Sequence, residues 1–500
     1  MSTCSLLSFS LCFLVLFHGS LAQLGFGQGQ ATSPWHTQRR FGAQRECRLE
    51  RLDAIEPLRR VQSEAGFIEY FDQNNEQLRC AGVSAKRVII QPRGLLLPSY
   101  NNAPSLVYVL QGRGITGKIF PGCPETYQSF HQQIEQVVEE GQSQSERFRD
   151  EHQKIIRFRE GDILAMPAGI AHWCYNDGDA PVITVVVSDT SNSANQLDPR
   201  HREFLLAGRR QRGQQAQPYE HEREQEQEQE QHSGNNVLSG FSVELLAEAL
   251  GVSNEVARRL QNQNDQRGQI VRVDRGLHLL KPSRREQQPQ EEEEEEEEER
   301  RREERRQSNG LDEAFCTMRT RENINDPNRA DVYNQQSGWI TYVNNQKLPA
   351  LNLVQMSALR GVLRRRNAMV TPFWNINAHS IMYVTGGRGR VQAVDSRGRS
   401  VFDGEVSRGQ LLVIPQNYAV VKRAVRERFE WVSFKTNSNA MVSQIAGKAS
   451  AFRGLPVDVI ANAYQISREE ARRVKFNRGD ELGIFTPRLS QAGIGSEVEV

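Results

Sequence analysis

Apolar residues in this chain occur in short runs, and the pattern of those runs recurs twice. Residues 182–187 and 411–414 are rich in β-branched and other apolar side chains, and Gly and Pro residues separate such runs. Short runs of this kind predict the strands of a β-sandwich or β-barrel. After the strands of each half, apolar positions at helical spacing predict a pair of amphipathic helices. The first pair lies within residues 241–261 and the second within residues 455–474. We therefore expect an all-β fold with helical arms, in which each of two β-barrels is followed by a helical extension.

The second half of the sequence repeats the first. Three pairs of segments match in the same order: residues 106–114 with 381–389, 161–167 with 409–415, and 245–259 with 459–473. Ordered matches of this kind indicate a duplicated domain. In the last helix of the second copy, Ser467 and Glu470 have the spacing of a capping box. Ser253 has the matching position in the first copy, where Val256 replaces the Glu.

Polar segments interrupt the repeat. Residues 209–236 and 284–309 contain few apolar side chains, and residues 291–299 are nine consecutive Glu. Such segments cannot bury enough apolar surface to offset the entropy of ordering, so we predict disordered loops. A helical rod over residues 291–306 is the weaker interpretation, because like charges repel along a helix.

The first residues have the pattern of a secretory signal. Residues 6–17 are apolar but too short to cross a bilayer, and small residues follow them. We expect cleavage between Ala22 and Gln23, although no Lys or Arg precedes the apolar run. No later stretch approaches about 18 apolar residues, so no membrane anchor is predicted.

The net charge of +1 conceals two halves of opposite sign. Residues 1–309 hold 37 basic and 45 acidic side chains, a net of −8, whereas residues 310–500 hold 26 and 17, a net of +9. The positive charge is dispersed through apolar sequence, which argues against nucleic-acid binding and favours attraction between the halves. The chain also has 54 Arg and 44 Gln. Carboxylate pairing explains Arg but not Gln tracts such as residues 225–229, so the composition favours a nitrogen reserve.

One glycine-containing stretch carries a family resemblance. Gly161, Pro167, Gly169, His172 and Asn176 have the spacing of the second motif of the cupin superfamily. Together with the duplication, this chain resembles a bicupin, which implies two jelly-roll barrels.

A second resemblance narrows the family. Residues 309–318, which begin with Asn309 and Gly310, resemble the junction at which precursors of legumin-type (11S) seed storage globulins are cut after Asn. Asn-Gly is also a common tight turn, but a long acidic segment before it suits an extended protease substrate. The resemblance implies an asparaginyl endopeptidase as processing enzyme, a trimeric precursor, a hexamer after cleavage, and transport through the endoplasmic reticulum to a protein storage vacuole.

These features divide the chain into five predicted parts. They are a signal peptide (1–22), an acidic chain with the first barrel and arm (23–275), a disordered Glu/Arg-rich loop (276–309), a basic chain with the second barrel and arm (310–490), and a tail (491–500).

Enzymatic cupins hold a metal with three His and one Glu, and only His172 matches that set. The other positions align with residues that are poor ligands: Tyr100 and Asn102 in the first copy, and Asn375, Asn377 and Val420 in the second. His379 lies nearby in sequence, but one imidazole does not make a metal site. We therefore predict no catalytic residues, metal or cofactor. The alternatives are a metal-dependent bicupin enzyme with its metal at His172, or a ligand-binding bicupin that uses the barrel interior.

Glycines at residues 112–114 and 386–389 resemble phosphate loops at first sight. They follow predicted strands and lack the Lys-Ser/Thr of a phosphate loop, so we predict hairpin turns with positive φ.

Five cysteines remain after removal of the signal: Cys47, Cys80, Cys123, Cys174 and Cys316. An odd number in an oxidising route leaves one free thiol. Only Cys316 lies beyond the predicted cut, so a covalent link between the halves requires it. The family resemblance assigns Cys123 as its partner, which leaves Cys47 and Cys80 as a local pair and Cys174 as a free, buried thiol.

Overall fold

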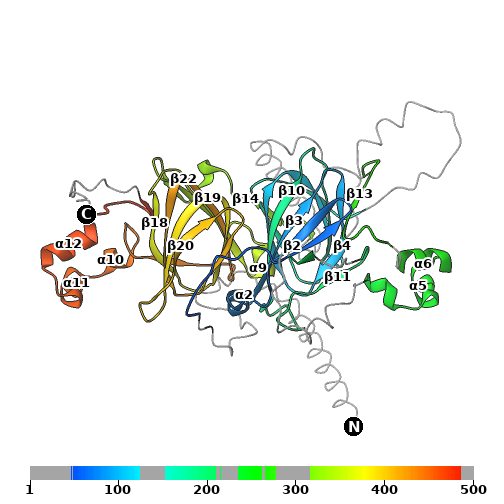
Figure 1. Ribbon diagram of the computed structural model, residues 1–500, viewed down its shortest axis with the longest axis horizontal. Helices are drawn as coiled ribbons and strands as arrows, with labels where there is room; N and C mark the ends of the chain where they lie inside the picture. Colours follow the sequence, from blue (N-terminus) through cyan, green and yellow to red (C-terminus); the bar gives the residue numbers. More distant parts are fainter. Residues whose placement is uncertain are drawn as a thin grey trace, which may run out of the picture. The chain divides into compact units, whose positions relative to one another are not determined.

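The computed structural model describes residue 47 and residues 49–123, 152–209, 214–215, 235–261, 265–277 and 316–485. Within these ranges, strands dominate and short helices follow each set of strands (Figure 1). The prediction of a mainly β fold with helical extensions is confirmed.

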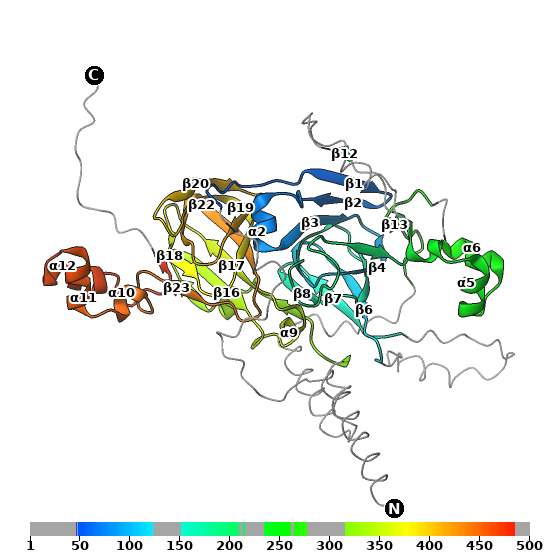
Figure 2. The ribbon, with the colours of Figure 1, turned by 90° about the horizontal axis from the view of Figure 1, so that it is seen from below.

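The first barrel is built from two antiparallel sheets. The strands of its larger sheet are β1 (Arg59–Ser63), β2 (Gly66–Tyr70), β3 (Val83–Ile90), β5 (Ser105–Gln111), β8 (Asp162–Met166), β10 (Val182–Asp189), β12 (Gln214–Gln215) and β14 (Arg321–Asn323). They lie in the order β12-β1-β2-β3-β10-β5-β8-β14. Figure 2 shows β1, β2 and β3 side by side. The smaller sheet contains β4 (Gly94–Asn101), β6 (Arg113–Ile119), β7 (Ile155–Arg159), β9 (Ala171–Tyr175), β11 (Glu203–Leu205) and β13 (Ile270–Arg272). Alternating apolar side chains from both sheets, among them Val88, Val186 and Ile270, fill the space between them.

The strands of the second barrel form one ten-stranded antiparallel sheet. Its strands are β15 (Val332–Asn334), β16 (Gly338–Val343), β17 (Ser357–Leu363), β18 (Met369–Asn375), β19 (Ser380–Val394), β20 (Ser400–Ser407), β21 (Leu411–Ile414), β22 (Ala419–Lys435), β23 (Val442–Gln444) and β24 (Ile484–Phe485). The long strands β19 and β22 pair with each other along most of their length. Leu359, Met382 and Trp431 belong to the apolar core of this barrel.

Gly112 does not form the hairpin turn that we predicted. It lies between β5 and β6, which belong to different sheets, so the chain passes there from one sheet to the other. Its φ of 87° is in the left-handed region, and an added Cβ would lie 2.7 Å from the carbonyl oxygen of Pro181. In the second barrel, residues 386–389 remain inside β19, where the register with β22 shifts and Gly387 has a φ of 70°. Positive φ is confirmed at Gly112 and Gly387, but the predicted hairpin turns are wrong. The first barrel uses its glycine for the passage between two sheets, and the second uses its glycines for a register shift within β19.

Two helical arms follow the barrels. The first comprises η2 (Val237–Gly240), α5 (Val243–Leu250) and α6 (Asn254–Gln261), and the second comprises α10 (Ala451–Gly454), α11 (Val457–Tyr464) and α12 (Arg468–Phe476). Figure 1 shows them as the green and red helical groups. Ser467 and Glu470 form the predicted capping box of α12. At the matching place in α6, the Ser253 hydroxyl accepts only the backbone N–H of Val256.

The two halves of the chain exchange segments. β14, from the second half, adds a strand to the first barrel by pairing with β8. In return, Leu49 and Leu52 from the first half pack into the core of the second barrel. The Leu52 N–H donates to Val401 O at 2.8 Å, and Ile55 exchanges two backbone hydrogen bonds with Leu411. Each barrel therefore contains chain from the other half.

A continuous apolar core joins the two barrels. It includes Phe71 and Val187 from the first half and Leu351 and Phe434 from the second, all nearly without exposed surface. The remaining helices lie near this region or in loops: α2 (Glu76–Ala81), η4 (Pro327–Arg329) and α9 (Leu351–Val354). The boundary between the halves is thus packed like a domain interior.

Equivalent strands supply reciprocal polar contacts across this boundary. Arg87 on β3 donates to the Tyr383 hydroxyl at 3.3 Å, and Arg360 on β17 donates to the Tyr108 hydroxyl at 3.0 Å. The two tyrosines occupy matching places in the sequence repeat. The interface between the barrels therefore has approximate twofold symmetry, as duplication of one domain predicts.

Candidate functional site

His172 lies on β9 of the first barrel, directly opposite Ser99 on β4 and Lys118 on β6. Burial lowers the pKa of His172 to about 4, so its imidazole is neutral at physiological pH. Its Nδ1 atom lies 3.3 Å from the carbonyl oxygen of Ile170. A serine and a lysine are its cross-strand neighbours, and a lysine ammonium repels a metal cation.

The register of β4 shows which residues stand in for metal ligands in the first barrel. Ser99 faces His172, and Asn101 is buried two positions farther along. Tyr100, between them, stacks instead on an aromatic ring of β11, with 5.0 Å between ring centroids. Asn102 hydrogen bonds to loop residues beyond the strand. The sequence alignment that put Tyr100 and Asn102 at these positions is wrong by one residue, because β4 changes register before Ser99.

In the second barrel, Val420 lies opposite Phe373 and is buried. Asn375 accepts a 2.5 Å hydrogen bond from the Nζ of Lys435, and Asn377 donates to a backbone carbonyl oxygen at 3.1 Å. His379 lies outside the strands, where its Nδ1 accepts the backbone N–H of a residue after β21 at 3.2 Å. Across the described ranges, no group of three or more His, Cys, Asp or Glu side chains is placed to hold a metal ion.

Buried lysines were not predicted from the sequence. Lys118, Lys422 and Lys435 are each at most 3% exposed, and burial lowers the pKa of all three, to about 7 for Lys118 and Lys435. Lys118 donates to Ala165 O at 2.8 Å and to the Thr320 hydroxyl at 2.7 Å, so it links the first barrel to the second half of the chain. The only signal in the sequence was the presence of Lys inside apolar strands of a chain that otherwise uses Arg.

The structure contains two disulfides. Cys123, just after β6, is bonded to Cys316, just before β14, with 5.5 Å between their Cα atoms. Cys47 is bonded to Cys80 on α2, with 5.0 Å between Cα atoms. Because Cys316 lies next to the strand that the second half inserts into the first barrel, the Cys123–Cys316 bond fixes an exchange that is also held by strand pairing.

Cys174 is the one cysteine without a disulfide among the five that the structure describes. Burial raises the pKa of its thiol to about 12, so the thiolate form is absent near neutral pH. The side chain packs in the apolar core of the first barrel and is partly rather than fully buried.

The predicted processing residues Asn309 and Gly310 lie outside the described residues, as do Ala22 and Gln23. The described chain resumes at Cys316, six residues after Gly310 in the numbering. In the part that the structure describes, no helix combines the length and apolarity needed to cross a membrane.

Exposed apolar side chains concentrate on the helical arms. Ten of the fourteen large apolar residues that are exposed in the described ranges lie at residues 241–260 and 455–476. Leu245 on α5 is 63% exposed, and Val459 at the matching position on α11 is 47% exposed. Exposed apolar side chains that concentrate on two elements in this way point to an interaction surface.

Comparisons with known proteins agree with this geometry. The model of the Cupin family matches residues 52–212 and 322–472. Glutelin type-A 3 of Oryza sativa subsp. japonica is 58% identical over 483 residues, which is 95% of each chain. Cocosin 1 of Cocos nucifera is 56% identical over 490 residues, which is 98% of each chain.

Solved structures show the same relationship. The crystal structure of the coconut allergen cocosin superposes with a TM-score of 0.74 at 53% identity, covering 89% of this chain and all of that one. Pumpkin seed globulin superposes with a TM-score of 0.73 at 42% identity, covering 88% of this chain and all of that one. Both the sequence and the fold place this chain, with its two cupin domains, in the family of 11S, legumin-type seed storage globulins.

Proposed function

We propose that this protein is a nitrogen reserve of the seed, whose mechanism is assembly and processing rather than catalysis. The observation that carries the proposal is the full-length similarity to glutelins, joined to barrel interiors in which Ser99, Asn101, Asn375 and Val420 stand where a metal would need ligands. The high counts of Arg and Gln support it, because both side chains are rich in nitrogen. The rival, a metal-dependent bicupin enzyme, requires a stoichiometric metal at His172. Metal analysis of the purified protein tests it, and one Mn or Fe per chain would overturn the non-enzymatic assignment.

The precursor is cut after Asn309 by an asparaginyl endopeptidase, giving an acidic and a basic chain. The Cys123–Cys316 disulfide and the exchanged segments support this, because they keep the two products together after the cut. Treatment of the purified precursor with such a protease is expected to give two fragments on reducing gels. Asn309→Gln abolishes this cleavage, whereas Asn235→Gln, in the other polar segment, leaves it unchanged. Cleavage of Asn309→Gln at the same place would contradict the assignment.

The helical arms join subunits, first into trimers and, after cleavage, into hexamers. The exposed apolar side chains of α5 and α11 support this, because their transfer from water is favourable by roughly 25 cal/mol per Å². Leu245→Asp is therefore expected to give monomers in sedimentation velocity. Leu197→Asp, at a site that is 60% exposed but outside the arms, serves as the matched control and should assemble normally. Assembly of Leu245→Asp like the control would count against the arms.

Delivery follows the secretory route. The apolar leader is removed between Ala22 and Gln23 as a signal peptide. The chain then passes through the endoplasmic reticulum, whose oxidising lumen suits its two disulfides. It is finally deposited in a protein storage vacuole. N-terminal sequencing of the mature acidic chain tests the first step, for which the proposal requires Gln23 as the first residue.

A further inference from the structure

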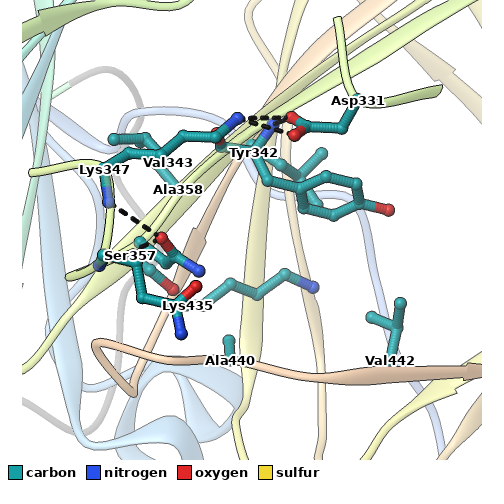
Figure 3. Close-up of a pocket in the computed structure, with 12 residues that line it drawn as sticks. Asp331, Tyr342, Val343, Lys347, Ser357, Ala358, Lys435, Ala440 and Val442 are labelled. Carbon is teal, nitrogen blue, oxygen red and sulfur yellow. Dashed lines mark hydrogen bonds and ion pairs between the residues drawn. The ribbon is translucent and has the colours of Figure 1, made fainter. Parts of the chain in front are cut away.

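A cavity of about 260 Å³ opens at one end of the second barrel. Its wall includes apolar or aromatic side chains from β16, β17 and β23, among them Tyr342, Leu359 and Val442. Lys435 on β22 reaches into it, and Figure 3 shows its amine between the Tyr342 ring and Val442. The cavity therefore combines an apolar wall with one buried cationic group.

No carboxylate in the described ranges is ion-paired with Lys435. The one acidic residue of the cavity wall, Asp331, is already paired with Lys347, whose Nζ lies 2.6 Å from its carboxylate. A second buried lysine, Lys422, lies deeper in the barrel, with Nζ 4.8 Å from the ring centre of Trp431. Among the described residues neither amine has a carboxylate partner, so an anion bound in this barrel interior would stabilise their charged forms.

Other polar atoms beside Lys435 also lack partners. The Nδ2 of Asn375 and the hydroxyl oxygens of Ser380 and Ser433 are buried, and none has a hydrogen-bond partner in the structure. Ser380 lies directly opposite Lys435 in the pairing of β19 with β22, and Ser433 is two residues away on the same face of β22. The Oδ1 of Asn375 accepts from Lys435, which places the unpaired Nδ2 of the same amide next to the amine. Each of these groups can donate a hydrogen bond to an acceptor that lies beside the amine.

The first barrel has no lysine at the position equivalent to Lys435. Its residue at the equivalent register position is Ser188, which lies opposite Ser84 and Ser105 just as Lys435 lies opposite Ser357 and Ser380. Ser188 and Ser105 satisfy each other through a hydroxyl contact of 2.7 Å. The shared fold therefore does not require a lysine at this position, and the lysine is particular to the second barrel.

We propose that the second barrel binds a small organic anion, a monocarboxylate, with its carboxylate at the Nζ of Lys435 and its apolar body against Tyr342 and Val442. The carboxylate supplies a counter-ion for Lys435 and a hydrogen-bond acceptor for the Nδ2 of Asn375 and the hydroxyl of Ser380. A short hydrocarbon chain suits the mixed polar and apolar wall.

Binding of an anion is coupled to protonation of the amine. Burial lowers the pKa of Lys435 to about 7, so the charged form predominates below that pH. The other charged or titratable groups that face it are Lys422, whose pKa is lowered by burial and by the nearby Lys435, the Asp331–Lys347 pair, and Tyr342, whose pKa burial raises to about 12. Loss of the Lys435 proton removes the ammonium that would pair with the carboxylate, so affinity is expected to fall as the pH rises through about 7.

Calorimetric titration of the full chain with sodium butyrate tests the site. The expected result is saturable binding that is stronger at about pH 6 than at about pH 8 and is absent for butyramide, the uncharged analogue of the same size. Lys435→Met keeps the side-chain length and should weaken binding at least about tenfold. Lys448→Met, which alters an exposed lysine of the same half, should leave it unchanged.

Val442→Trp provides a second variant, because it fills the cavity and retains the amine; it should also abolish binding. No saturable binding of butyrate to the unaltered chain would overturn the proposal. So would equal binding by Lys435→Met, or equal binding of butyramide, because either result removes the ammonium–carboxylate contact from the account.

Discussion

Arg360 shows at the scale of one residue how the two barrels are held together. Its guanidinium donates to the Tyr108 hydroxyl of the first barrel and, at 2.7 Å, to the carboxylate of Glu430 in the second. The side chains of Arg360 and Glu430 are 7% and 8% exposed, so the pair is nearly dry. Removal of one partner of such a pair lowers the free energy of unfolding, because the charge of the other partner stays buried.

Arg360→Met is therefore expected to lower the free energy of unfolding by about 3 kcal/mol, at the low end for a broken buried pair, because Glu430 retains Arg428 as a partner. Denaturant titration measures the change. Arg388→Met, which removes an exposed pair with Glu405, is the control and should change stability by less than about 1 kcal/mol. Equal effects of the two substitutions would show that burial of the Arg360 pair is unimportant.

Lys118 gives the stability a defined pH dependence. Its pKa falls from 10.5 in the unfolded chain to about 7 when buried, so between these values the unfolded state binds the extra proton. Stability contributed by this group therefore increases as the pH rises from about 7 towards 10.5. Lys118→Met should reduce the slope of unfolding free energy against pH in this window by up to about 1.4 kcal/mol per pH unit. Thermal or denaturant unfolding at several pH values tests this, and an unchanged slope would mean that Lys118 is protonated in the native state.

The conformation of a single residue could be predicted where it depends only on the neighbouring sequence. The capping box at Ser467 follows from sequence spacing alone, and Gly112 was correctly expected to need positive φ. Lys118 and Lys435 were not predicted, because their burial depends on strand pairing with residues far away in sequence. The same reason explains the one-residue error at Tyr100, since a register change inside β4 leaves no mark on motif spacing.

At the scale of elements, the strands and the paired helices follow from the hydrophobic pattern, but the exchange of segments does not. β14 has only three residues and no strong apolar pattern, and it forms a strand because β8 offers an unpaired edge. Similarly, Leu49, Leu52 and Ile55 carried no signal for the barrel into which they pack. Their destination depends on the packing of both halves together.

The exchange predicts that the disulfide is not the main connection between the halves. In a Cys316→Ser variant that has been cleaved after Asn309, β14 still pairs with β8 and the joint apolar core remains buried. We expect the two chains to elute together in size-exclusion chromatography under native conditions. They should separate only in denaturant, where both contacts are lost. Separation of the chains without denaturant would show that the covalent bond alone holds them.

At the scale of the whole molecule, the duplicated fold is compatible with the proposed cleavage and the proposed storage role. Two cupin domains share a core and exchange segments, and the two halves of the chain carry opposite net charge. We therefore expect the folded unit to survive the proposed cut between the halves. The barrels provide a compact framework, and the arms offer apolar surface for the proposed assembly. The disulfide adds a covalent link to a structure that is already interlocked.

The most direct test of the proposed cleavage and disulfide link is gel electrophoresis in denaturant. The mature protein is extracted from seed and run with and without reductant. Denaturant removes the strand pairing and the shared core, so only the Cys123–Cys316 bond can then join the two halves. The account predicts one band without reductant and two smaller bands with it, the smaller product beginning at Gly310. A single band of unchanged size in both conditions would contradict the cleavage, and two bands without reductant would contradict the disulfide link.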